Sequence, residues 1–390
     1  MVSRPRVLIR TLPLQAGNYG GIVQAWAMQQ VLQGMGLSAA TDVSERRVGR
    51  PPLAARAKSF AKKTILDLPL VRIDNPGLTS EHLKPRIDVR LRRFVDENLA
   101  TTSVFDGADV RTGVLDDYDG FLVGSDQVWR ARWSDIRSYL FDFLATEDPR
   151  PRISYAASFG KDDLTEYSAQ LVHDAAALAA RMTALSVRES SGVDICRDQW
   201  GVAAEVHVDP TMLLERSSYQ RLYSTTPSAF NEPTLLSYVL DKSARATDHV
   251  DHVASLTGLS VRSMSPEEPR TIPEFRRDPD RFTRPGVPDW LAAFEHADFV
   301  VTDSFHGTVF AILNNTPFLT IINRSRGASR FDSLLGRLSL AHRVIDPADN
   351  IPEELIAAPI NWSEVNERLA HERDRGLTFL RSAFASLIDG

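Results

Sequence analysis

The sequence predicts an α/β protein with two Rossmann-like domains, whose mostly parallel sheets face each other across a cleft. Short apolar strands alternate with amphipathic helices along the chain, which is the pattern of parallel sheets. A polar, turn-rich stretch from Glu215 to Pro233 divides the chain, and the alternation starts again after it. The length of 390 residues suits about two domains of ordinary size.

Composition excludes several classes of protein. Apolar residues make up 43% and charged residues 25%, and the net charge of −6 gives no general attraction to nucleic acid. The single cysteine excludes an internal disulfide framework and fits a reducing compartment. No stretch resembles a signal peptide or has the about 20 apolar residues of a membrane span. We expect a soluble cytoplasmic protein; its oligomeric state stays open.

The first half opens on a strand, a glycine turn and a helix. The strand is Val7 to Arg10, the turn contains Asn18, Gly20 and Gly21, and the helix runs from Ile22 to Met35. The turn lacks the G-x-G-x-x-G spacing, so it does not indicate a dinucleotide. Its glycines let backbone amides approach an anion or a sugar, and a tight turn without function is the alternative.

A basic segment follows a predicted strand at Ala40 to Val43. Residues 45–95 differ from the rest of the chain, because seven Lys and Arg side chains and no acid lie between positions 46 and 63. We interpret the segment as a solvated basic helix. The alternatives are a mobile flap over the cleft, or a surface for a phosphorylated acceptor or for anionic lipid at the inner membrane face. Leu83 to Leu99 is a predicted amphipathic helix.

Two further strands of the first half end in polar loops. Tyr118 to Val123 leads to Ser125, Asp126 and Gln127, which could hydrogen-bond sugar hydroxyls. Trp129 either stacks on a sugar ring or lies in the core. The strand from Ile153 to Phe159 precedes a long predicted helix, for which Asp163 and Glu166 form a capping box.

The next strand, Ala184 to Val187, ends in Arg188 and Glu189. The planar fork of an arginine matches carboxylate and phosphate, so Arg188 is a candidate anion ligand. An ion pair with a neighbouring acid such as Glu189 is the alternative. Val206 to Val208 then leads to Asp209 and Pro210, which close the half.

The second half repeats the pattern. Strands are predicted at 235–240, near Val261 and at 344–345, and residues 265–289 are predicted to be a loop. Helices are predicted at 249–256, 290–296 and 362–387.

The stretch from Phe299 to Ile322 is the main functional candidate. Phe299, Val300 and Val301 form a strand apolar on both faces, and His306 and Gly307 follow it in a predicted turn. Thr308 is the expected cap of the next helix. A histidine at a strand end beside a helix amino terminus suits an anionic ligand, and a satisfied core histidine is the alternative.

Arginines follow the next strand end. Arg324, Arg326 and Arg330 lie in one loop, which is the densest candidate anion site in the chain.

These segments resemble the polysaccharide pyruvyl transferases. The resemblance is carried, in the order of the family, by NYGGIVQAWAMQQVL, GSDQVW, SYAASFG, SVRESSG, HVDPTMLL, and ADFVVTDSFHGTVFAILNNTPF followed by RGASRF. They span Asn18 to Phe331. The resemblance implies a fold similar to two-domain GT-B glycosyltransferases, with the last helix packing back on the first domain. We expect an acceptor-side domain at 1–215, a donor-side domain at 216–365 and a terminal helix at 366–390.

The resemblance also implies an activity in exopolysaccharide or cell-envelope biosynthesis. A pyruvyl group would pass from phosphoenolpyruvate, a substrate, to two hydroxyls of a free, lipid-linked or polymeric glycan, giving a cyclic ketal and phosphate. No cofactor is implied. His306 and Arg188 correspond to residues that contact phosphoenolpyruvate in relatives. Ser304 stands where some relatives have arginine, and we expect Arg326 or Arg330 to supply the missing guanidinium.

The proposed chemistry fits these residue types. A histidine with an ordinary pKa near 6.5 can deliver or remove a proton, so His306 is the predicted acid. Asp126, Glu189 and Asp303 are candidates for the base, or for the stabiliser of an oxocarbenium-like intermediate. The predicted catalytic residues are His306, Arg188 and Asp126. The predicted substrate-binding residues are Ser304, Gly307, Thr308, Arg326, Arg330, Asn18, Gly20, Gly21, Ser125, Gln127 and Glu189.

Two other functions stay open. One is a nucleotide-sugar glycosyltransferase with the arginine loop on a diphosphate. The other is a catalytically silent protein of a glycan-assembly complex, which only the serine at position 304 favours. No His/Cys pattern has metal-ligand spacing, so we predict no required metal.

Overall fold

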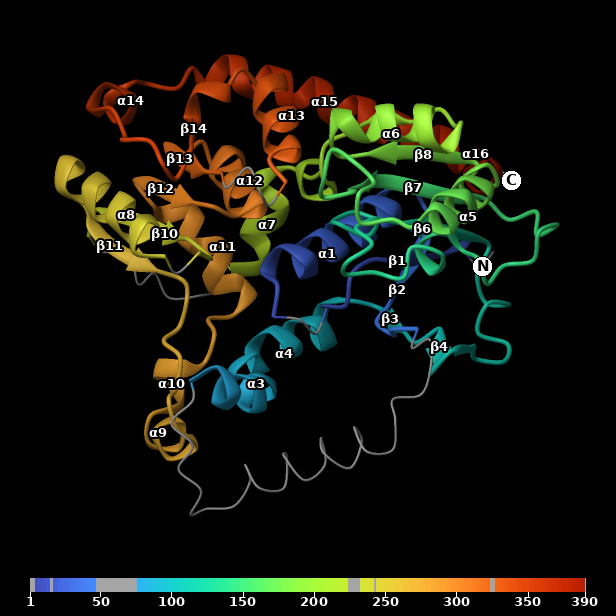
Figure 1. The fold of residues 1–390 in the computed structure, drawn as a ribbon, viewed down its shortest axis with the longest axis horizontal. Coiled ribbons are helices and arrows are strands. Elements are labelled where there is room, and N and C mark those ends of the chain that lie inside the picture. Colours follow the sequence, from blue (N-terminus) through green and yellow to red (C-terminus); the bar gives the residue numbers. More distant parts are fainter. Residues whose placement is uncertain are drawn as a thin grey trace.

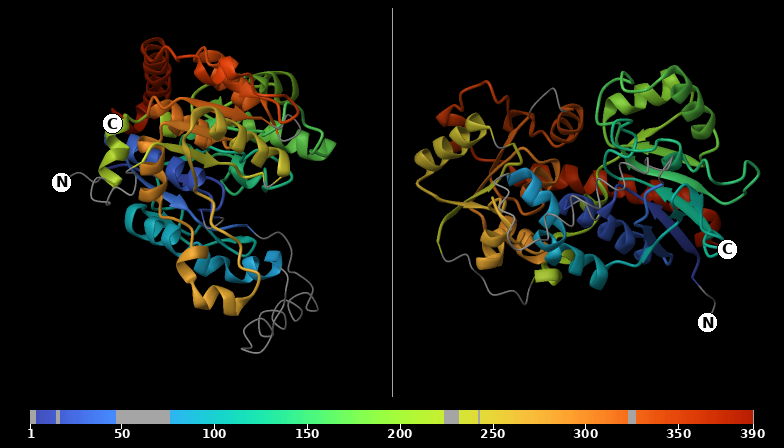
Figure 2. Two further views of the ribbon diagram at one scale, coloured as in Figure 1. Left: turned by 90° about the vertical axis from the view of Figure 1, so that its left-hand side faces the viewer. Right: turned by 60° about the horizontal axis from the view of Figure 1, so that its bottom comes forward.

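Two parallel β-sheets, one in each half of the chain, form the framework of this computed structural model (Figure 1). The structure describes residues 4–14, 17–46, 76–223, 232–241, 243–322 and 327–389. The two sheets belong to two lobes that lie side by side (Figure 2). The predicted α/β architecture with parallel sheets is confirmed.

The first sheet has seven parallel strands in the order β3-β2-β1-β6-β7-β8-β9. Chain order runs outward from β1 on one side and from β6 on the other. The boundary between β1 and β6 is therefore the topological switch point, beyond which ligands bind in open sheets. The strands are β1 (Arg6–Arg10), β2 (Ser38–Asp42), β3 (Thr101–Thr102), β6 (Gly120–Val123), β7 (Arg152–Ala157), β8 (Ala184–Val187) and β9 (Glu205–Val206).

The second sheet has five parallel strands in the order β11-β10-β12-β13-β14. Its switch point lies between β10 and β12. All four residues of β12 are buried, as its apolar sequence predicts for a central strand. The strands are β10 (Thr234–Tyr238), β11 (Ser260–Ser263), β12 (Phe299–Thr302), β13 (Phe318–Ile321) and β14 (Val344–Ile345), and an antiparallel pair elsewhere is β4 (Phe105–Asp106) and β5 (Asp109–Val110).

Helices follow most strands, and no helix in the described ranges is long and apolar enough to cross a membrane. In the first half they are α1 (Tyr19–Gly34), α3 (Pro76–Ile87), α4 (Val89–Asn98), η2 (Ser138–Leu140), α5 (Ala169–Ala179), α6 (Ser190–Trp200) and η3 (Pro210–Met212). The later ones are α7 (Arg216–Tyr223), α8 (Ala244–Thr257), α9 (Ile272–Arg277), α10 (Pro279–Phe282), α11 (Val287–His296), α12 (Phe305–Leu313), α13 (Ser329–Arg337), η5 (Ala341–Arg343), α14 (Glu353–Ala357), α15 (Trp362–Ala383) and α16 (Ala385–Ile388).

The predicted capping box at Asp163 is wrong. The Asp163 carboxylate accepts hydrogen bonds from N and Oγ1 of Thr165, which form a local turn. α5 begins six residues later than Asp163, and its cap is Ser168, whose Oγ accepts from Leu171 N at 3.2 Å. Short-range bonding of an aspartate to the next backbone groups competes with capping, and here it prevails.

Five other segments differ from the prediction. The predicted turn at Gly20 and Gly21 is instead the first turn of α1, which begins at Tyr19. The single helix expected at 83–99 is two helices, α3 and α4, joined at the buried Asp88. The predicted loop 265–289 contains α9 and α10, and the polar linker contains α7. The helix predicted at 362–387 ends at Ala383 and continues as α16. α7, α9 and α10 have only eight, six and four residues, which is too short for a clear periodic pattern in the sequence.

Aromatic contacts join the two lobes. Tyr19 of α1 stacks on Trp290 of α11, with ring centroids 5.2 Å apart and planes 9° apart. Its hydroxyl donates to the Pro285 carbonyl at 2.7 Å. An ion pair adds to this contact: Arg284, after α10, donates through Nε to Oδ1 of Asp88, between α3 and α4, at 2.8 Å. The lobes are thus held by both packing and an ion pair.

α15 extends from the second lobe back to the first, and α16 lies beside the first sheet (Figure 1). α15 approaches the first lobe closely at Gly376, because a Cβ there would lie 2.3 Å from Tyr155 Oη and 2.8 Å from Leu213 Cδ2. Tyr155 is fully buried, and in the described part of the chain its hydroxyl has no hydrogen-bond partner. The expectation that the last helix packs on the first domain is confirmed.

Replacing Gly376 with alanine is expected to destabilise the protein by about 1–3 kcal/mol, because the added methyl group overpacks the α15 contact. Tyr155→Phe should recover most of this loss, since it removes the clashing oxygen. Urea denaturation of both single variants and the double variant measures the coupling. The control is Gly336→Ala in α13, where a Cβ meets nothing within 4 Å. If G376A lowers the free energy of unfolding equally with and without Y155F, the assigned contact between Gly376 and the Tyr155 hydroxyl is contradicted.

His207 gives the fold a second testable property. Its ring stacks on Tyr155 and packs on Phe379 of α15, at centroid distances of 5.8 and 4.9 Å. Burial, together with the charges of Arg375 and Arg337, lowers the pKa of His207 to about 4.

Stability is expected to fall as the pH drops from about 6.5 to 4. In this window the unfolded chain binds a proton at His207 and the folded chain does not, so protonation favours unfolding. The loss is at most about 3 kcal/mol for this shift, and the Glu205 carboxylate 3.2 Å from Nε2 reduces it. Urea midpoints of wild type and His207→Phe across this window measure the effect. Parallel pH curves for the two proteins would contradict the assignment.

Candidate active site

A fully buried carboxylate, Asp209, lies between β9 and η3 at the centre of a charged cluster. Its Oδ2 accepts hydrogen bonds from Ser125 Oγ at 2.9 Å and Arg188 Nη1 at 3.1 Å. Its Oδ1 accepts from N and Oγ1 of Thr211 at 3.0 and 2.7 Å. These donors all come from the first half of the chain, and they fix the orientation of the carboxylate.

Arg188 links Asp209 to a second carboxylate. It follows the last residue of β8, and its side chain is only 2% exposed. Its Nη2 lies 3.4 Å from Asp126 Oδ1, and its guanidinium lies 4.3 Å from the ring centre of Phe305 in α12. Arg188 therefore does form ion pairs, with Asp126 and Asp209 rather than with Glu189. Its Nε has no hydrogen-bond partner among the described residues.

Ser304, and not Thr308, caps α12. The Ser304 Oγ accepts a hydrogen bond from Gly307 N at 3.3 Å, and the helix begins at Phe305. Thr308 is fully buried, and its hydroxyl lies 2.9 Å from that of Thr320. His306 and Gly307 therefore stand in the first turn of the helix rather than in a preceding turn. The first N–H groups of a helix lack intrahelical partners, so this end attracts anions.

His306 brings the second half of the chain to Asp209. Its Nε2 lies 3.5 Å from Asp209 Oδ2, the distance of an ion pair rather than of a short hydrogen bond. The other side of the imidazole rests on Gly20, where a Cβ would lie 2.0 Å from Nδ1. Only glycine at position 20 leaves room for this ring. Gly20 and His306, 286 positions apart in the sequence numbering, thus form one contact.

The charges of the cluster change the pKa values of two acids in opposite directions. Burial would raise the pKa of Asp209, but the charge of His306 and then that of Arg188 hold it well below its ordinary value. Burial raises the pKa of Glu189, and the Arg188 charge and the hydrogen bond from Ser158 only partly offset this. Asp209 is consequently an anion at neutral pH, and Glu189 is the more easily protonated acid.

Glu189 holds the loop after β7. Its Oε1 accepts hydrogen bonds from Ser158 Oγ at 2.9 Å, Phe159 N at 2.6 Å and Gly160 N at 3.3 Å. Its Oε2 has no partner in the part of the chain that the structure describes. Gly160 in turn touches the second lobe, because a Cβ on Gly327 would lie 2.1 Å from the Gly160 carbonyl oxygen.

Arg330, at the start of α13, adds a positive charge from the second lobe. Its Nε and Nη1 are buried, and neither has a hydrogen-bond partner within the described ranges. Burial and the nearby charge of Arg188 lower its pKa to about 10, against the opposing charges of Asp126 and Glu189. Arg326, the other predicted donor of a guanidinium, lies outside the described residues, as do positions 47–63 of the basic segment.

Several other predicted residues lie in or beside this cluster. Asn18 Nδ2 lies 3.4 Å from Asp126 Oδ2, and a Cβ on Gly21 would lie 3.2 Å from Asn18 Nδ2. Gln127 Oε1 accepts from Arg130 Nη1 at 3.1 Å. The loops after β1 and β6, which flank the switch point, therefore meet at the site.

Other candidates have structural roles in this arrangement. Gly307 gives close helix packing, since a Cβ there would lie 2.3 Å from Thr302 Oγ1. Asp303 accepts hydrogen bonds from the backbone N atoms of Leu240 and Asp241 and so fixes the loop after β10. Trp129 is fully buried in the core between Phe159 and Trp200 and cannot stack on a sugar.

Asp209 is the site residue that the sequence interpretation missed as functional. Its partners Ser125 and Arg188 are 84 and 21 positions away, and His306 is in the other half. The available signal was an aspartate directly after a strand and before a proline in HVDP. Polar residues at that position of a parallel sheet often face a ligand.

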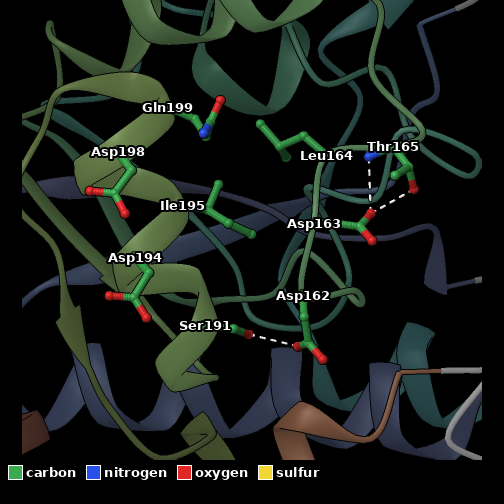
Figure 3. A pocket seen from close by; sticks show the side chains of 9 residues that line it. All are labelled: Asp162, Asp163, Leu164, Thr165, Ser191, Asp194, Ile195, Asp198 and Gln199. Carbon is green, nitrogen blue, oxygen red and sulfur yellow. Dashed lines mark hydrogen bonds between the residues drawn. The ribbon is translucent and has the colours of Figure 1, made fainter.

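A cavity of about 520 Å³ beside α6 is separate from the Asp209 cluster (Figure 3). Four carboxylates line it, those of Asp162, Asp163, Asp194 and Asp198, and Ser191 donates to Asp162 at 2.8 Å. Its negative charge does not suit an anionic substrate. In the ranges that the structure describes, no group of three or more His, Cys, Asp or Glu could hold a metal ion.

Solved structures share the fold over almost the whole chain. A protein of Listeria monocytogenes assigned as a UDP-N-acetylglucosamine 2-epimerase has a TM-score of 0.51 at 8% identity, covering 98% of both chains. The UDP-GlcNAc 2-epimerase of Neisseria meningitidis, bound to UDP-GlcNAc, has 0.48 at 8% identity, covering 98% of this chain and 100% of its own. Medicago truncatula UGT71G1, complexed with UDP-glucose, has a TM-score of 0.45 at 11% identity, covering 99% of this chain and 98% of its own.

The likeness to the Listeria monocytogenes protein supports a two-domain GT-B-like fold and carries nothing about the substrate of this chain. A search of curated proteins finds no match. A comparison with protein families does find a match: residues 18–325 match polysaccharide pyruvyl transferase. The match covers most of the chain and includes Asp126, Arg188, Asp209 and His306. The chain therefore belongs to the polysaccharide pyruvyl transferase family.

Proposed function

We propose that this enzyme transfers the pyruvyl group of phosphoenolpyruvate onto two hydroxyls of a sugar in a polysaccharide or its precursor. The products are a cyclic ketal and phosphate. One observation carries the proposal. Arg188 Nε, His306 Nε2 and two nitrogens of Arg330 are buried in one cluster without a hydrogen-bond partner among the described residues. Buried donors without partners are costly, and an anion with several oxygens satisfies them.

The reaction balances without an outside oxidant, reductant or cofactor. The first sugar hydroxyl adds to C2 of the enol phosphate, and a proton goes to C3, which becomes a methyl group. The C2–O bond to phosphate then breaks, leaving an oxocarbenium-like carbon. The second hydroxyl adds to that carbon, and its proton leaves with the phosphate. The site must therefore bind two anionic groups, move two protons and stabilise one positive carbon.

The anionic groups of the donor are assigned to the second lobe. The amino terminus of α12 attracts a phosphate through its free N–H groups. Arg330 supplies the guanidinium that a serine at position 304 does not, since the Ser304 side chain is engaged as the helix cap. Arg188 reaches the same donor through Nε, while its two Nη atoms stay on Asp209 and Asp126.

His306 is the assigned acid. Its Nε2 lies 3.5 Å from Asp209 Oδ2, and the Asp209 carboxylate orients the imidazole ring. Asp126, held by Asn18 and Arg188, is the assigned base for the sugar hydroxyl. The Asp209 charge also opposes the positive charge that develops on C2. A nucleotide-sugar transferase would use the same fold, but it does not account for the family match.

His306→Ala is expected to lower turnover at least about 100-fold, because a positioned acid contributes on the order of 10²–10⁴ in rate. Phosphate release and ketal formation are followed with phosphoenolpyruvate and a panel of glycans, and nucleoside diphosphate release with nucleotide sugars. The control is His173→Ala, an exposed histidine on α5. Near-wild-type turnover of H306A would remove His306 from the mechanism, and turnover of nucleotide sugars alone would replace the proposed function.

Arg330→Ala is expected to raise the KM for phosphoenolpyruvate about 10- to 100-fold, the equivalent of one charge-assisted hydrogen bond. The KM of Arg330→Lys should lie between those of the wild type and R330A, because a lysine keeps the charge without the planar fork. R330A should also unfold at the same or a higher temperature, since it removes two buried nitrogen atoms that have no hydrogen-bond partner among the described residues. An unchanged KM for phosphoenolpyruvate in R330A would overturn this assignment.

A further inference from the structure

Trp133 is a large aromatic side chain that the fold leaves in solvent. It is 55% exposed, whereas Trp26, Trp129, Trp200 and Trp290 are at most 6% exposed. A single exposed apolar side chain is common and needs no explanation by exposure alone. Two further features distinguish Trp133. An ordered turn fixes its backbone, and Arg130 connects its indole to the charged cluster around Asp126 and Asp209.

The backbone of Trp133 is fixed by a short turn after β6. Trp133 N and Ser134 N both donate to the Arg130 carbonyl, at 3.0 and 3.2 Å. The Ser134 hydroxyl lies 2.7 Å from the Val128 carbonyl and 2.9 Å from that of Arg130. The indole is thus presented by an ordered turn, which lowers the entropy lost when a ligand stacks on it.

Arg130 connects the indole to the active site. Its guanidinium lies 4.1 Å from the ring centre of Trp133, within the range of a cation–π contact. The Arg130 side chain is 7% exposed, and its Nη1 donates to Gln127 Oε1 at 3.1 Å. Gln127 N in turn donates to Asp126 Oδ1 at 2.9 Å. Trp133 therefore lies three contacts away from the assigned base.

Further polar groups lie around Arg130, whose guanidinium is next to the aromatic ring. Glu166 accepts from Arg130 Nη2 at 3.4 Å and from Arg132 N at 3.2 Å, and its Oε1 lies 3.6 Å from Lys161 Nζ. A carboxylate has roughly four acceptor positions, so one remains for a ligand hydroxyl. Lys161 is partly exposed and adds a donor. An open aromatic face next to a few fixed polar groups is the pattern of a small-molecule subsite.

We propose that Trp133, together with Glu166 and Lys161, which are linked to it through Arg130, forms a subsite for a pyranose ring of the acceptor glycan. The C–H groups on one face of a pyranose carry partial positive charge and dock on the negative face of an indole, while the ring hydroxyls bond to the polar neighbours. The subsite rests on the proposed function in one respect, because it positions the sugar whose hydroxyls would attack the pyruvyl carbon near Asp126.

The first test is binding, without turnover. Acrylamide quenching of tryptophan fluorescence is measured with methyl β-D-glucopyranoside, galactopyranoside and mannopyranoside, and with UDP. Trp133 should dominate the quenched signal, and at least one pyranoside should protect it. Trp133→Phe should abolish the protectable signal, and the control Trp362→Phe, on α15, should keep it. Protection by UDP alone, or by none of the four compounds, would overturn the proposal.

The second test is kinetic and separates this subsite from the proposed function. Trp133→Ala should raise the KM for the protecting pyranoside about tenfold, the effect of one lost stacking contact. Its kcat and its KM for phosphoenolpyruvate should stay within threefold, and Trp133→Phe should restore most of the sugar affinity. Turnover with an unchanged sugar KM in W133A would overturn the subsite alone. Pyranoside protection in a protein that never consumes phosphoenolpyruvate would overturn the proposed function alone.

Discussion

The buried charge of Asp209 is the constraint on which the rest of the site depends. A carboxylate removed from water is costly unless several donors and a positive charge compensate it. Ser125, Thr211 and Arg188 provide this in the first half of the chain, and His306 approaches from the second. The electrostatic balance of the cluster is therefore complete only when both lobes are in place, so the geometry of the cluster depends on the whole fold.

The contacts between the lobes meet this requirement from several sides. Stacking of Tyr19 on Trp290 places α1 against α11, and the same helix carries Gly20, on which the His306 ring rests. α15 anchors the opposite side through Gly376. Because these contacts leave no room for a Cβ at either glycine, small residues at the interface set the distance between His306 and Asp209. The packing of these helices thus also sets the geometry of the charged cluster.

The sequence was a good guide to the sheets and a partial guide to the site. Buried strands ending in polar glycine loops are local signals, so β1, β6, β8 and β12 and the loops at the switch points could be predicted. Ser125, Asp126, Arg188 and His306 were brought together as expected. Asp209 was not identified, because its role comes from partners distant in sequence. Thr308 is the predicted cap because His306 and Gly307 are expected to lie in a turn before the helix. The helix begins earlier, at Phe305, and Ser304 is its cap.

In the proposed function, the unpartnered donors of both lobes bind the enol phosphate, and the Asp209 charge assists its conversion into a sugar ketal. The most direct measurement follows phosphoenolpyruvate labelled with ¹³C at C2 by NMR, with an acceptor glycan, for wild type and Asp209→Asn. The account predicts equal amounts of quaternary ketal carbon and phosphate for the wild type. For D209N it predicts retained donor binding with neither product. Release of free pyruvate without any ketal, or unchanged ketal formation by D209N, would contradict it.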